Sequence, residues 1–459
     1  MSKHFSLDNI KNAYFVGIGG VSMSSLAIVL KNRGAIVGGY DMKQSENTLM
    51  LENLGIQIDY EHNLDNLNGC DTVIYTAAVS KETAPELSYA ENNGLLLLTR
   101  AELLGAVTAS YKHSVGVSGT HGKSTTTGMI ASIYMEFDNE SSVLSGCVIP
   151  KLHSTYKIGN SDRIVFEACE YKDSFLSMCP SLKLVLNCKL DHVDYFKDIE
   201  AVKDSFTKYM DIPHAFGENM ALVNLDCENA ADAAKKATTK VYYYSTEKPC
   251  DFYAKNIRIV NGCGIFDLYS NENLIISDIT LSVPGMHNVS NATAAAASAL
   301  LTGVSEIAVK KGLENFTGVA RRFEKKGEYN KTVLVDDYAH HPDEIEVTLN
   351  TAKTLNKNRI ICVFQPHTYS RTKALLSDFA KSLSIADKIY LLDIFPAREE
   401  NIYGISSNDL ADKIKKPCIC ASFEEIAEML KKEIDEDDLV ITMGAGEAYK
   451  VADILLKND

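Results

Sequence analysis

The stretch HSVGVSGTHGKSTTT (residues 113–127) constrains the fold of this chain more than any other part of the sequence. Its first residues are mainly apolar and predict a short strand, and its end starts a helix with apolar side chains at helical spacing. Between them, Gly119 and Gly122 remove the side chains that would keep backbone N–H groups from surrounding a phosphate. Lys123 adds a positive charge there, and Ser124 offers a hydroxyl of the kind that binds Mg²⁺. The stretch therefore predicts a strand, a phosphate-binding loop and a helix.

This loop departs from the strict phosphate-loop pattern, because Val117 occupies the position of the first glycine. The remaining motif, GTHGKS, has two readings: a nucleotide site, or an ordinary strand-to-helix turn with an exposed lysine. The strand before it and the helix after it favour the nucleotide site.

A second glycine turn, GIGG at residues 17–20, follows an apolar strand predicted at 13–18. The next predicted strand, 35–40, ends at Asp41, an acid placed where dinucleotide-binding sheets contact a ribose. Ser22 stands at the third glycine position of that fingerprint. The pattern indicates either a sugar-nucleotide site or a Rossmann-type turn that binds nothing.

Acidic residues and a histidine follow two strands predicted after the phosphate loop. Residues 163–168 deliver Glu167 and Glu170, and residues 183–187 lead toward His192. Because α/β sheets bind ligands at the carboxyl ends of their strands, we expect these groups to converge on the loop. Glu167 suits Mg²⁺, and His192 a second ion. The alternative is that Glu167 forms a salt bridge with a loop and His192 is a surface histidine.

The predicted secondary structure then changes from alternating strands and helices to strands. Residues 241–283 are β-rich, with a hairpin signal at Asn261-Gly262, and a Pro-Gly pair ends this part. Asn288 and Asn291 precede an alanine-rich helix, where they would either cap the helix or bind an adenine edge.

Strands and helices alternate again in the last part of the chain, with polar groups clustered where the strands end. The fold class expected is α/β with three domains. We place a Rossmann-like domain at residues 1–110, a central P-loop ATPase-type domain with a β-rich part at 111–317, and a Rossmann-like C-terminal domain at 318–459.

Composition excludes several classes of function. The net charge of −15 argues against an extended nucleic-acid-binding surface. The aliphatic runs, such as residues 95–98, are far shorter than the roughly 20 residues of a membrane span, and the N-terminus has no apolar signal segment. The eleven scattered cysteines do not resemble a disulfide framework. We therefore expect a cytoplasmic protein with reduced cysteines and neither nucleic acid nor membrane as partner.

In their order along the chain, the motifs resemble the Mur ligase family of peptidoglycan synthesis. They are GIGG at 17–20, GTHGKS at 119–124, EACE at 167–170, DH at 191–192, HNVSN at 287–291, RRF at 321–323, DDYAHHP at 336–342 and FQPHTYSRT at 364–372. The resemblance implies an ATP-dependent ligase that joins the lactyl carboxylate of UDP-N-acetylmuramate to L-alanine through an acyl phosphate. This is an early cytoplasmic step of cell wall synthesis. Ligation of another amino acid or peptide, and a nucleotide-binding regulatory protein without turnover, are the alternatives.

The resemblance also implies a role for individual residues. The expected catalytic residues are Lys123, Glu167, His192 and Arg322. The expected metal ligands are Ser124 and Glu167 for the magnesium of ATP and His192 for a second ion during turnover. The expected ATP contacts are Gly119, Thr120, His121, Gly122, Lys123, Ser124, Thr125, Asn288, Asn291, Arg322 and Asp337. The first domain would hold the UDP part of the sugar nucleotide through Gly17, Gly19, Gly20 and Asp41. The last domain would line the carboxylate and amino-acid end with Tyr338, His340, His341, His367 and Arg371.

Several positions depart from what is common in this family: Ser124 stands in place of threonine, and Ser22 and Ser25 stand in place of glycines. Cys169 and Lys172 replace carboxylates, and Lys189 replaces a glutamate. These changes leave the expected metal ligands in place but alter the charge around them.

Overall fold

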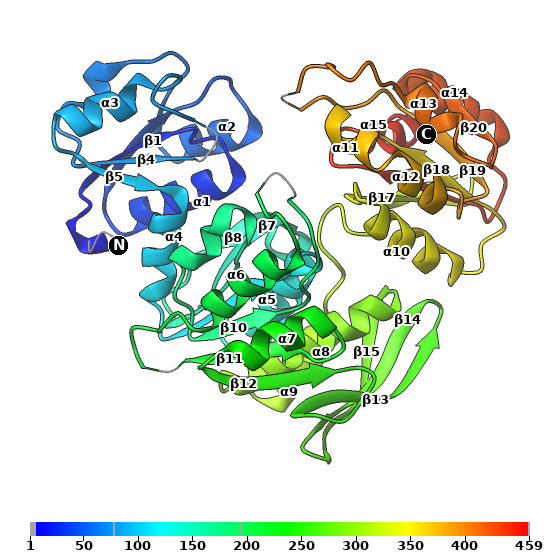
Figure 1. Cartoon of the computed structure of the whole chain (residues 1–459), viewed down its shortest axis with the longest axis horizontal. Coiled ribbons are helices and arrows are strands. Elements are labelled where there is room, and N and C mark those ends of the chain that lie inside the picture. Colours follow the sequence, from blue (N-terminus) through cyan, green and yellow to red (C-terminus); the bar gives the residue numbers. More distant parts are fainter. Residues whose placement is uncertain (1–5, 77–78, 193–194, 218, 398, 458–459) are drawn as a thin grey trace. The chain divides into compact units, whose positions relative to one another are not determined.

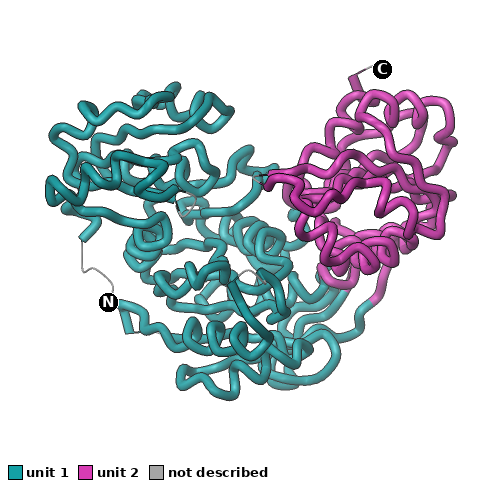
Figure 2. Tube along the Cα trace, turned by 45° about the horizontal axis from the view of Figure 1, so that its top comes forward, with its two compact units in different colours: residues 1–257, 266–280, 289–316 teal, residues 258–265, 281–288, 317–459 magenta. Residues whose placement is uncertain are grey.

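The computed structural model describes residues 6–76, 79–192, 195–217, 219–397 and 399–457, which form three sheets (Figure 1). Two compact units divide the chain (Figure 2). The first unit comprises residues 1–257, 266–280 and 289–316, and the second comprises 258–265, 281–288 and 317–459.

The first sheet is parallel, with the strand order β3-β2-β1-β4-β5. Its strands are β1 (Asn12–Val16), β2 (Ile36–Tyr40), β3 (Gln57–Asp59), β4 (Thr72–Tyr75) and β5 (Leu96–Thr99). Its helices are η1 (Leu7–Asn9), α1 (Val21–Asn32), α2 (Glu46–Asn53), η2 (Leu64–Leu67), α3 (Pro85–Asn92) and α4 (Arg100–Ala109). Side chains of β1 alternate between the two faces of the sheet. Phe15 packs in the hydrophobic core on one face, and Tyr14 and Val16 pack in a separate core on the other, so both faces of the sheet are covered. The strand order reverses beside β1, and open α/β sheets generally bind ligands at the carboxyl end of the strands at such a point.

The second sheet has the order β15-β14-β13-β12-β11-β10-β6-β9-β7-β8. Its strands are β6 (His113–Ser118), β7 (Ser142–Ile149), β8 (Ser154–Lys157), β9 (Arg163–Glu167), β10 (Leu182–Val185), β11 (Met220–Asn224), β12 (Lys240–Ser245), β13 (Phe252–Val260), β14 (Cys263–Ser270) and β15 (Asn273–Pro284). The helices along this part are α5 (Lys123–Phe137), η3 (Pro150–Leu152), η4 (Tyr171–Ser177), α6 (Ile199–Met210), α7 (Glu228–Lys236), α8 (Met286–Leu301) and α9 (Glu306–Glu314). The strand before the phosphate loop, β6, pairs in parallel with β9 and β10, so the three strands end at one edge.

Two expectations for the β-rich segment have different outcomes. The hairpin at Asn261-Gly262 is confirmed: both residues have positive φ, 49° and 79°, and join the neighbouring strands β13 and β14. The reading of Asn288 and Asn291 as helix caps is wrong, because α8 already begins at Met286. Gly285, with φ of 101°, turns the chain directly from β15 into this helix.

The third sheet belongs to the second unit and has the order β16-β17-β21-β18-β19-β20. Its strands are β16 (Glu324–Tyr329), β17 (Thr332–Asp337), β18 (Ile360–Phe364), β19 (Lys388–Leu391), β20 (Cys418–Cys420) and β21 (Leu439–Met443). Its helices are α10 (Pro342–Lys353), α11 (Tyr369–Ala374), α12 (Leu376–Leu383), α13 (Ser407–Ala411), α14 (Phe423–Glu433) and α15 (Lys450–Leu456). Only β16 runs antiparallel among the described pairs, and its charged sequence EKKGEY is typical of a protected edge strand. The α/β fold with parallel sheets is confirmed.

Among the helices that the structure describes, none combines the length and the apolar composition needed to cross a membrane.

Candidate active site

The phosphate loop joins β6 to α5 and has the backbone geometry that the two glycines predict. Gly119 has φ of 135° and Gly122 has φ of 85°, so both lie in the left-handed region that side chains disfavour. Gly122 is also the N-cap residue of α5, and no side chain caps this helix. The first N–H groups of α5 are therefore left for an anion.

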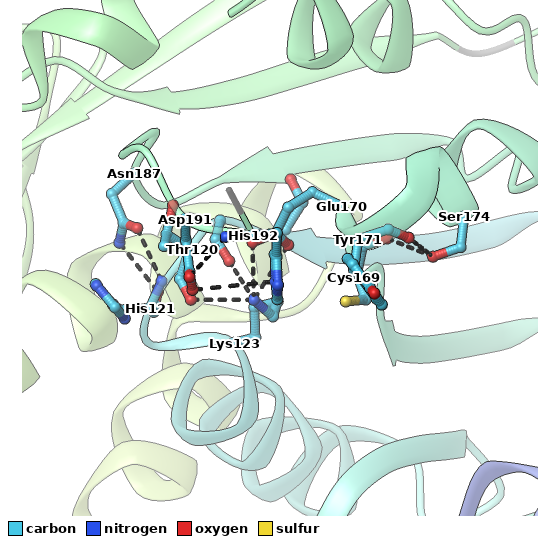
Figure 3. A network of polar contacts seen from close by, with 12 residues as sticks. Thr120, His121, Lys123, Cys169, Glu170, Tyr171, Ser174, Asn187, Asp191 and His192 are labelled. Atoms are coloured by element: carbon cyan, nitrogen blue, oxygen red, sulfur yellow. Dashed lines mark hydrogen bonds and ion pairs between the residues drawn. The ribbon is translucent and has the colours of Figure 1, made fainter. Parts of the chain in front are cut away.

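The loop is braced by Asn187, which follows β10 (Figure 3). Its Oδ1 accepts a hydrogen bond from the backbone N–H of His121 at 2.9 Å, and its Nδ2 donates to the carbonyl of His121 at 3.0 Å. The backbone N–H of Lys189 donates to the Thr120 hydroxyl at 3.0 Å. Sequence reasoning missed the role of Asn187, although its place at the end of a predicted strand was a usable signal.

The ammonium of Lys123 lies inside this loop. It donates to Glu170 Oε2 at 3.2 Å, to the carbonyl of Thr120 at 3.1 Å and to the carbonyl of Gly119. Burial by itself lowers the pKa of Lys123, but the negative groups around it, Glu170 foremost, leave that pKa raised above its usual value. Lys123 is therefore a protonated cation at pH 7, and Glu170 holds it at the loop.

Glu167 ends β9 and reaches toward β7. Its Oε1 accepts hydrogen bonds from the backbone N–H of Gly146 at 2.6 Å and from the hydroxyl of Ser145 at 3.2 Å. Within the described chain Glu167 forms no ion pair, so the salt-bridge reading of this residue is wrong. Its Oε2 accepts no hydrogen bond from those residues, which leaves one hard oxygen for a ligand.

His192 lies at the same edge of the sheet. Its ring packs on Tyr171 with 4.5 Å between the centroids, and its Nε2 is 4.0 Å from Asp191 Oδ2. The backbone of His192 has φ of 52°, an uncommon conformation for a residue with a side chain. The histidine is held in place by these contacts but stays partly exposed. Tyr171 was not anticipated from the sequence.

The described side chains near the phosphate loop offer few ligands for a divalent ion. No group of three or more His, Cys, Asp or Glu side chains in the described ranges has the arrangement of a metal site. Ser124 and Glu167 supply two hard oxygens, the ligand type that Mg²⁺ prefers, and Mg²⁺ commonly takes its other ligands from substrate phosphates and water. The residues fit an ion that arrives with a nucleotide.

Asn291 extends from α8 to the phosphate loop within the first unit. A Cβ atom at Gly122 would lie 2.9 Å from Asn291 Oδ1, so the two residues are in direct contact. Asn288, one turn earlier on α8, donates from Nδ2 to the carbonyl of Pro284 at 2.7 Å. The amide of Asn291 is thus placed beside the phosphate loop, whereas that of Asn288 ties the start of the helix to the end of β15.

The N-terminal glycine turn has a different construction. Gly17 has φ of 83°, and its N–H donates to the carbonyl of Tyr40 at 2.8 Å. The carboxylate of Asp41 accepts a hydrogen bond from the N–H of Gly19 at 2.7 Å, and Asn47 donates to the carbonyl of Gly19 at 2.8 Å. Asp41 therefore supports the turn itself. Gly20 is the N-cap residue of α1, which has no side-chain cap.

In the second unit, four of the predicted substrate residues form one cluster. The ring of His340 lies 5.4 Å from Tyr338 and 6.0 Å from His367 between centroids. Burial lowers the pKa of His340 and lowers that of His367 to about 4, and in both cases nearby Arg371 adds to the shift. Nη1 of Arg371 is buried without a hydrogen-bond partner. The cluster presents neutral imidazoles and a cation with unused donors.

His341 lies next to this cluster in sequence but has a local role. It is the N-cap residue of α10, and its ring accepts from the N–H of Asp343 at 3.3 Å. The reciprocal bond comes from the backbone N–H of His341 to Glu344 at 3.3 Å. The sequence prediction of a substrate contact for His341 did not anticipate this cap.

Asp337 and Arg322 lie at the carboxyl end of β17. The carboxylate of Asp337 accepts from the N–H of Phe323 at 2.8 Å and of Ala339 at 2.7 Å, and burial raises its pKa to about 6. Arg322 is 3.7 Å from Glu344, and its guanidinium lies 5.4 Å from the ring centre of Tyr338. Asp337 therefore holds together two backbone segments of the second unit, the one at Phe323 and the one at Ala339.

Comparison with known proteins gives three adjoining family matches. The N-terminal part, residues 12–112, matches the model described as the Mur ligase family catalytic domain. Residues 117–299 match the Mur ligase middle domain, and residues 321–446 match the Mur ligase glutamate ligase domain.

Relatives of full length are also found. The chain is 44% identical to UDP-N-acetylmuramate--L-alanine ligase of Caldicellulosiruptor saccharolyticus over 96% of this chain and 98% of that protein. It is 41% identical to the enzyme of the same name from Clostridium perfringens over the whole of both chains. Among solved structures, UDP-N-acetylmuramate-alanine ligase from Thermotoga maritima matches with a TM-score of 0.80 at 25% identity, covering 98% of this chain and 99% of the other.

Proposed function

The chain belongs to the Mur ligase family, and we infer that it is an ATP-dependent ligase that joins L-alanine to the lactyl carboxylate of UDP-N-acetylmuramate. The observation that carries this inference is the phosphate loop that holds Lys123 and Glu170 together beside an open oxygen of Glu167. Its full-length relatives with this activity support the choice of substrates. Such an enzyme acts early in peptidoglycan synthesis, and the sequence-based expectation of a cytoplasmic location is part of the proposal.

The residues of the loop suit the first chemical step. A carboxylate is a poor acyl donor, so a phosphoryl group must pass from ATP to one carboxylate oxygen, with ADP as the leaving group. Both reactants are anionic, and their repulsion has to be offset by fixed positive charge. Lys123 and the uncapped N-terminus of α5 supply this charge at one place.

ATP is the nucleotide that this family uses, and we propose Mg²⁺ as its metal, with two ions during turnover. Ser124 and Glu167 would hold the ion that accompanies ATP, and His192 would contact a second ion. Bound Mg²⁺ offsets the negative charge of the transferring phosphoryl group. The other ATP contacts that we propose are Gly119, Thr120, His121, Gly122, Thr125, Asn288, Asn291, Arg322 and Asp337.

The second step is attack by the amine of L-alanine on the acyl phosphate, with release of phosphate. An amine attacks only when it is unprotonated, so the site has to accept a proton. Burial lowers the pKa of His340 and lowers that of His367 to about 4, so both rings are neutral near pH 7. A histidine, a carboxylate or water would take the proton from the amine. The unused donors of Arg371 would bind a carboxylate, and Tyr338 and His341 complete the residues that we assign to this end of the site.

We propose domain boundaries at residues 1–110, 111–317 and 318–459, with the first domain holding the UDP part of the substrate. Gly17, Gly19, Gly20 and Asp41 form the turn that we assign to this task. In this assignment Asp41 acts mainly through the turn, since its carboxylate already accepts the N–H of Gly19.

Phosphate release tests the proposed function. Purified protein with ATP, Mg²⁺ and UDP-N-acetylmuramate is assayed with L-alanine, glycine, L-serine or no amino acid. Release that depends on both the sugar nucleotide and L-alanine is the expected result. Clear preference for another amino acid would replace the acceptor and keep the chemistry. ATP binding without release for any acceptor would favour a regulatory protein instead.

A further inference from the structure

The turn that follows β18 in the second unit has a strained backbone at Thr368, the N-cap residue of α11. Its φ is 66° and its ψ is 143°, a combination that is common only for glycine. Among the residues that the structure describes, Thr368 is the only β-branched one with a positive φ. Such strain persists only where the surrounding structure enforces it, and it is concentrated at functional sites.

Hydrogen bonds fix the peptide groups on both sides of Thr368. Its N–H donates to the carbonyl of Phe395 at 2.9 Å, and the N–H of Phe395 donates to the carbonyl of Pro366 at 2.8 Å. The carbonyl of Thr368 accepts from the hydroxyl of Thr372 at 2.7 Å. These bonds hold the two ends of the turn, and the residue between them takes the strain.

The turn decides how two side chains of the candidate site are presented. His367 precedes Thr368, and its ring stacks on Phe395 with 5.6 Å between the centroids and 19° between the planes. Arg371 follows in the first turn of α11, close enough to add to the lowering of the His367 pKa that burial causes. Nδ1 of His367 and Nη1 of Arg371 are both buried without a hydrogen-bond partner among the described residues. Both groups therefore have hydrogen-bonding capacity left for a ligand.

Glu399 holds the other side of this turn. Its Oε2 accepts from the N–H of Ser370 at 2.9 Å, and its Oε1 accepts from the hydroxyl of Ser370 at 2.5 Å. Thr368 supplies no side-chain cap to α11. The carboxylate of Glu399, 29 residues after Ser370, takes the place of that cap.

The environment of Glu399 does not suit a proton acceptor. Burial by itself raises the pKa of its carboxyl, but the hydrogen bonds from Ser370 and Tyr369 leave that pKa below its usual value. A carboxylate with a low pKa and with both oxygens in hydrogen bonds is a poor base at pH 7. Its negative charge is instead fixed on the turn.

We propose that Glu399 is a positioning residue that holds the strained turn, so that His367 and Arg371 face one substrate carboxylate. This rests on the proposed function, which supplies two carboxylates, that of L-alanine and that of the lactyl group of UDP-N-acetylmuramate. Without Glu399 the turn loses both bonds to Ser370, and Thr368 relaxes toward a negative φ. The two side chains then no longer point at the same group.

Steady-state phosphate release at pH 7 tests the proposal on the full chain. For each variant, kcat and the KM values for L-alanine, UDP-N-acetylmuramate and ATP are measured. Glu399→Ala removes both acceptors, and Glu399→Gln keeps one oxygen as an acceptor. Glu400→Ala is the matched control, because it removes the next glutamate in the chain, which is exposed.

We expect Glu399→Ala to raise the KM for a carboxylate substrate on the order of ten- to a hundredfold, because a displaced turn no longer presents its two side chains together. The larger rise, for L-alanine or for UDP-N-acetylmuramate, identifies the carboxylate. The KM for ATP should stay within about twofold of that of the unmodified protein. Glu399→Gln should lose less affinity than Glu399→Ala, and Glu400→Ala should match the unmodified protein.

Thr368→Gly gives a second measurement, because glycine adopts a positive φ without strain. In a double-mutant cycle, Glu399→Ala should therefore raise the same KM by no more than about threefold when it is combined with Thr368→Gly. A contribution of Glu399 to the general stability of the fold would be equal in both backgrounds.

Three outcomes would each overturn the proposal. The first is unchanged KM values for both carboxylate substrates in Glu399→Ala. The second is an equal rise in the KM for ATP, and the third is an equal effect of Glu399→Ala with and without Thr368→Gly. If Glu399→Ala fails to fold, Glu399→Gln and Ser370→Ala replace it, and unchanged KM values in both count against the proposal. If the unmodified protein releases no phosphate with L-alanine, the proposed function itself fails.

Discussion

Two glycine turns of the first unit, at residues 17–20 and at 119–124, share one backbone design and differ in charge. Each joins a parallel strand to the N-terminus of a helix without a side-chain cap. The phosphate loop contains its own cation, Lys123, held by Glu170 at 3.2 Å. The N-terminal turn contains a carboxylate instead, since Asp41 accepts the N–H of Gly19 at 2.7 Å.

This difference shows that a strand, a glycine turn and a helix do not by themselves define a phosphate site. The backbone supplies aligned N–H groups, but transfer of a phosphoryl group also needs a charge that stabilises the transition state. Binding needs less and can use a cation from elsewhere in the fold. In the first unit Arg100 of α4 donates to the hydroxyl of Ser22, which lies 78 residues away in the chain and just after the N-terminal turn.

The largest effect is expected for Lys123→Ala. We expect phosphate release to fall by roughly a hundred- to a thousandfold or more, because the transferring phosphoryl group loses its nearest fixed cation. Affinity for UDP-N-acetylmuramate should change by no more than about twofold, as the N-terminal turn keeps its residues. Phosphate release and calorimetric titration measure the two quantities.

The control for this variant is Lys151→Ala, which removes a lysine from an exposed ion pair with Glu136 at 3.0 Å. It should leave both quantities unchanged. If Lys123→Ala weakened sugar-nucleotide binding as much as it slowed release, the two turns would not have separate tasks.

The second largest effects are expected for glycine-to-alanine substitutions in the two turns. Gly17, Gly34 and Gly122 have similar φ values of 83°, 90° and 85°, but an added Cβ would lie 2.9 Å from Thr76 at Gly17, 2.9 Å from Asn291 at Gly122 and in open space at Gly34. Gly34→Ala should therefore cost only the left-handed strain, about 1–2 kcal/mol of unfolding free energy. Gly122→Ala should in addition weaken an ATP analogue by about tenfold, and Gly17→Ala should weaken the sugar nucleotide instead.

Urea unfolding gives the strain, and titration with each ligand gives the affinities. Equal loss of both ligands in Gly17→Ala and Gly122→Ala would contradict the separation, and Gly34→Ala sets the baseline for backbone strain alone.

A smaller effect is expected for Asp41, whose carboxylate supports the N-terminal turn. Asp41→Ala should lower the free energy of unfolding by about 1–2 kcal/mol, because Gly19 loses a charged acceptor. Asp41→Asn keeps an acceptor without the charge and should lose about half as much. Urea unfolding at pH 7 measures both. No loss in either variant would mean that water replaces the carboxylate at this N–H.

The smallest effect is expected in the second unit, where the neutral imidazole of His367 makes the free energy of unfolding depend on pH. Burial lowers the pKa of His367 to about 4, so the folded protein binds fewer protons than the unfolded chain. The free energy of unfolding is therefore unaffected by His367 at pH 7. It decreases as the pH falls from about 6.5 toward 4, because the unfolded chain takes up a proton that the folded protein does not. Because His367 is partly exposed, we expect a loss on the order of 1 kcal/mol between pH 7 and 5.

Urea unfolding of this chain and of His367→Asn at pH 7 and pH 5 measures that loss. The variant should have the smaller difference between the two pH values. His153→Asn removes an exposed histidine and is the control. An equal pH dependence in His367→Asn and the unmodified protein would exclude His367 as the source.

Sequence patterns anticipated most elements but missed those with unusual surroundings. The strand β16 was missed, because its sequence EKKGEY has neither the alternation nor the apolar run of a half-buried strand. The start of α8 was placed too late, because the turn at Gly285 brings the helix forward to Met286. Both errors concern ends or edges, where neighbouring elements decide the conformation.

For the candidate site, sequence patterns identified residue types better than contacts. They placed Lys123 in a phosphate loop, and the structure has that loop. They did not anticipate Asn187 as its brace, Tyr171 under the His192 ring, or Arg100 beside α1. These partners are polar or aromatic residues without a motif of their own, so no spacing rule marks them.

The sequence by itself determined the two turns, because glycine conformation, hydrophobic periodicity and helix initiation depend on residues close together in the chain. The tertiary structure alone decided which distant side chain each turn received: Glu170, 47 residues from Lys123, and Arg100, 78 residues from Ser22. Such partners depend on the order of strands in a sheet and on which helices pack together. Burial of the cores sets that order, and the burial is shared among residues from the whole unit.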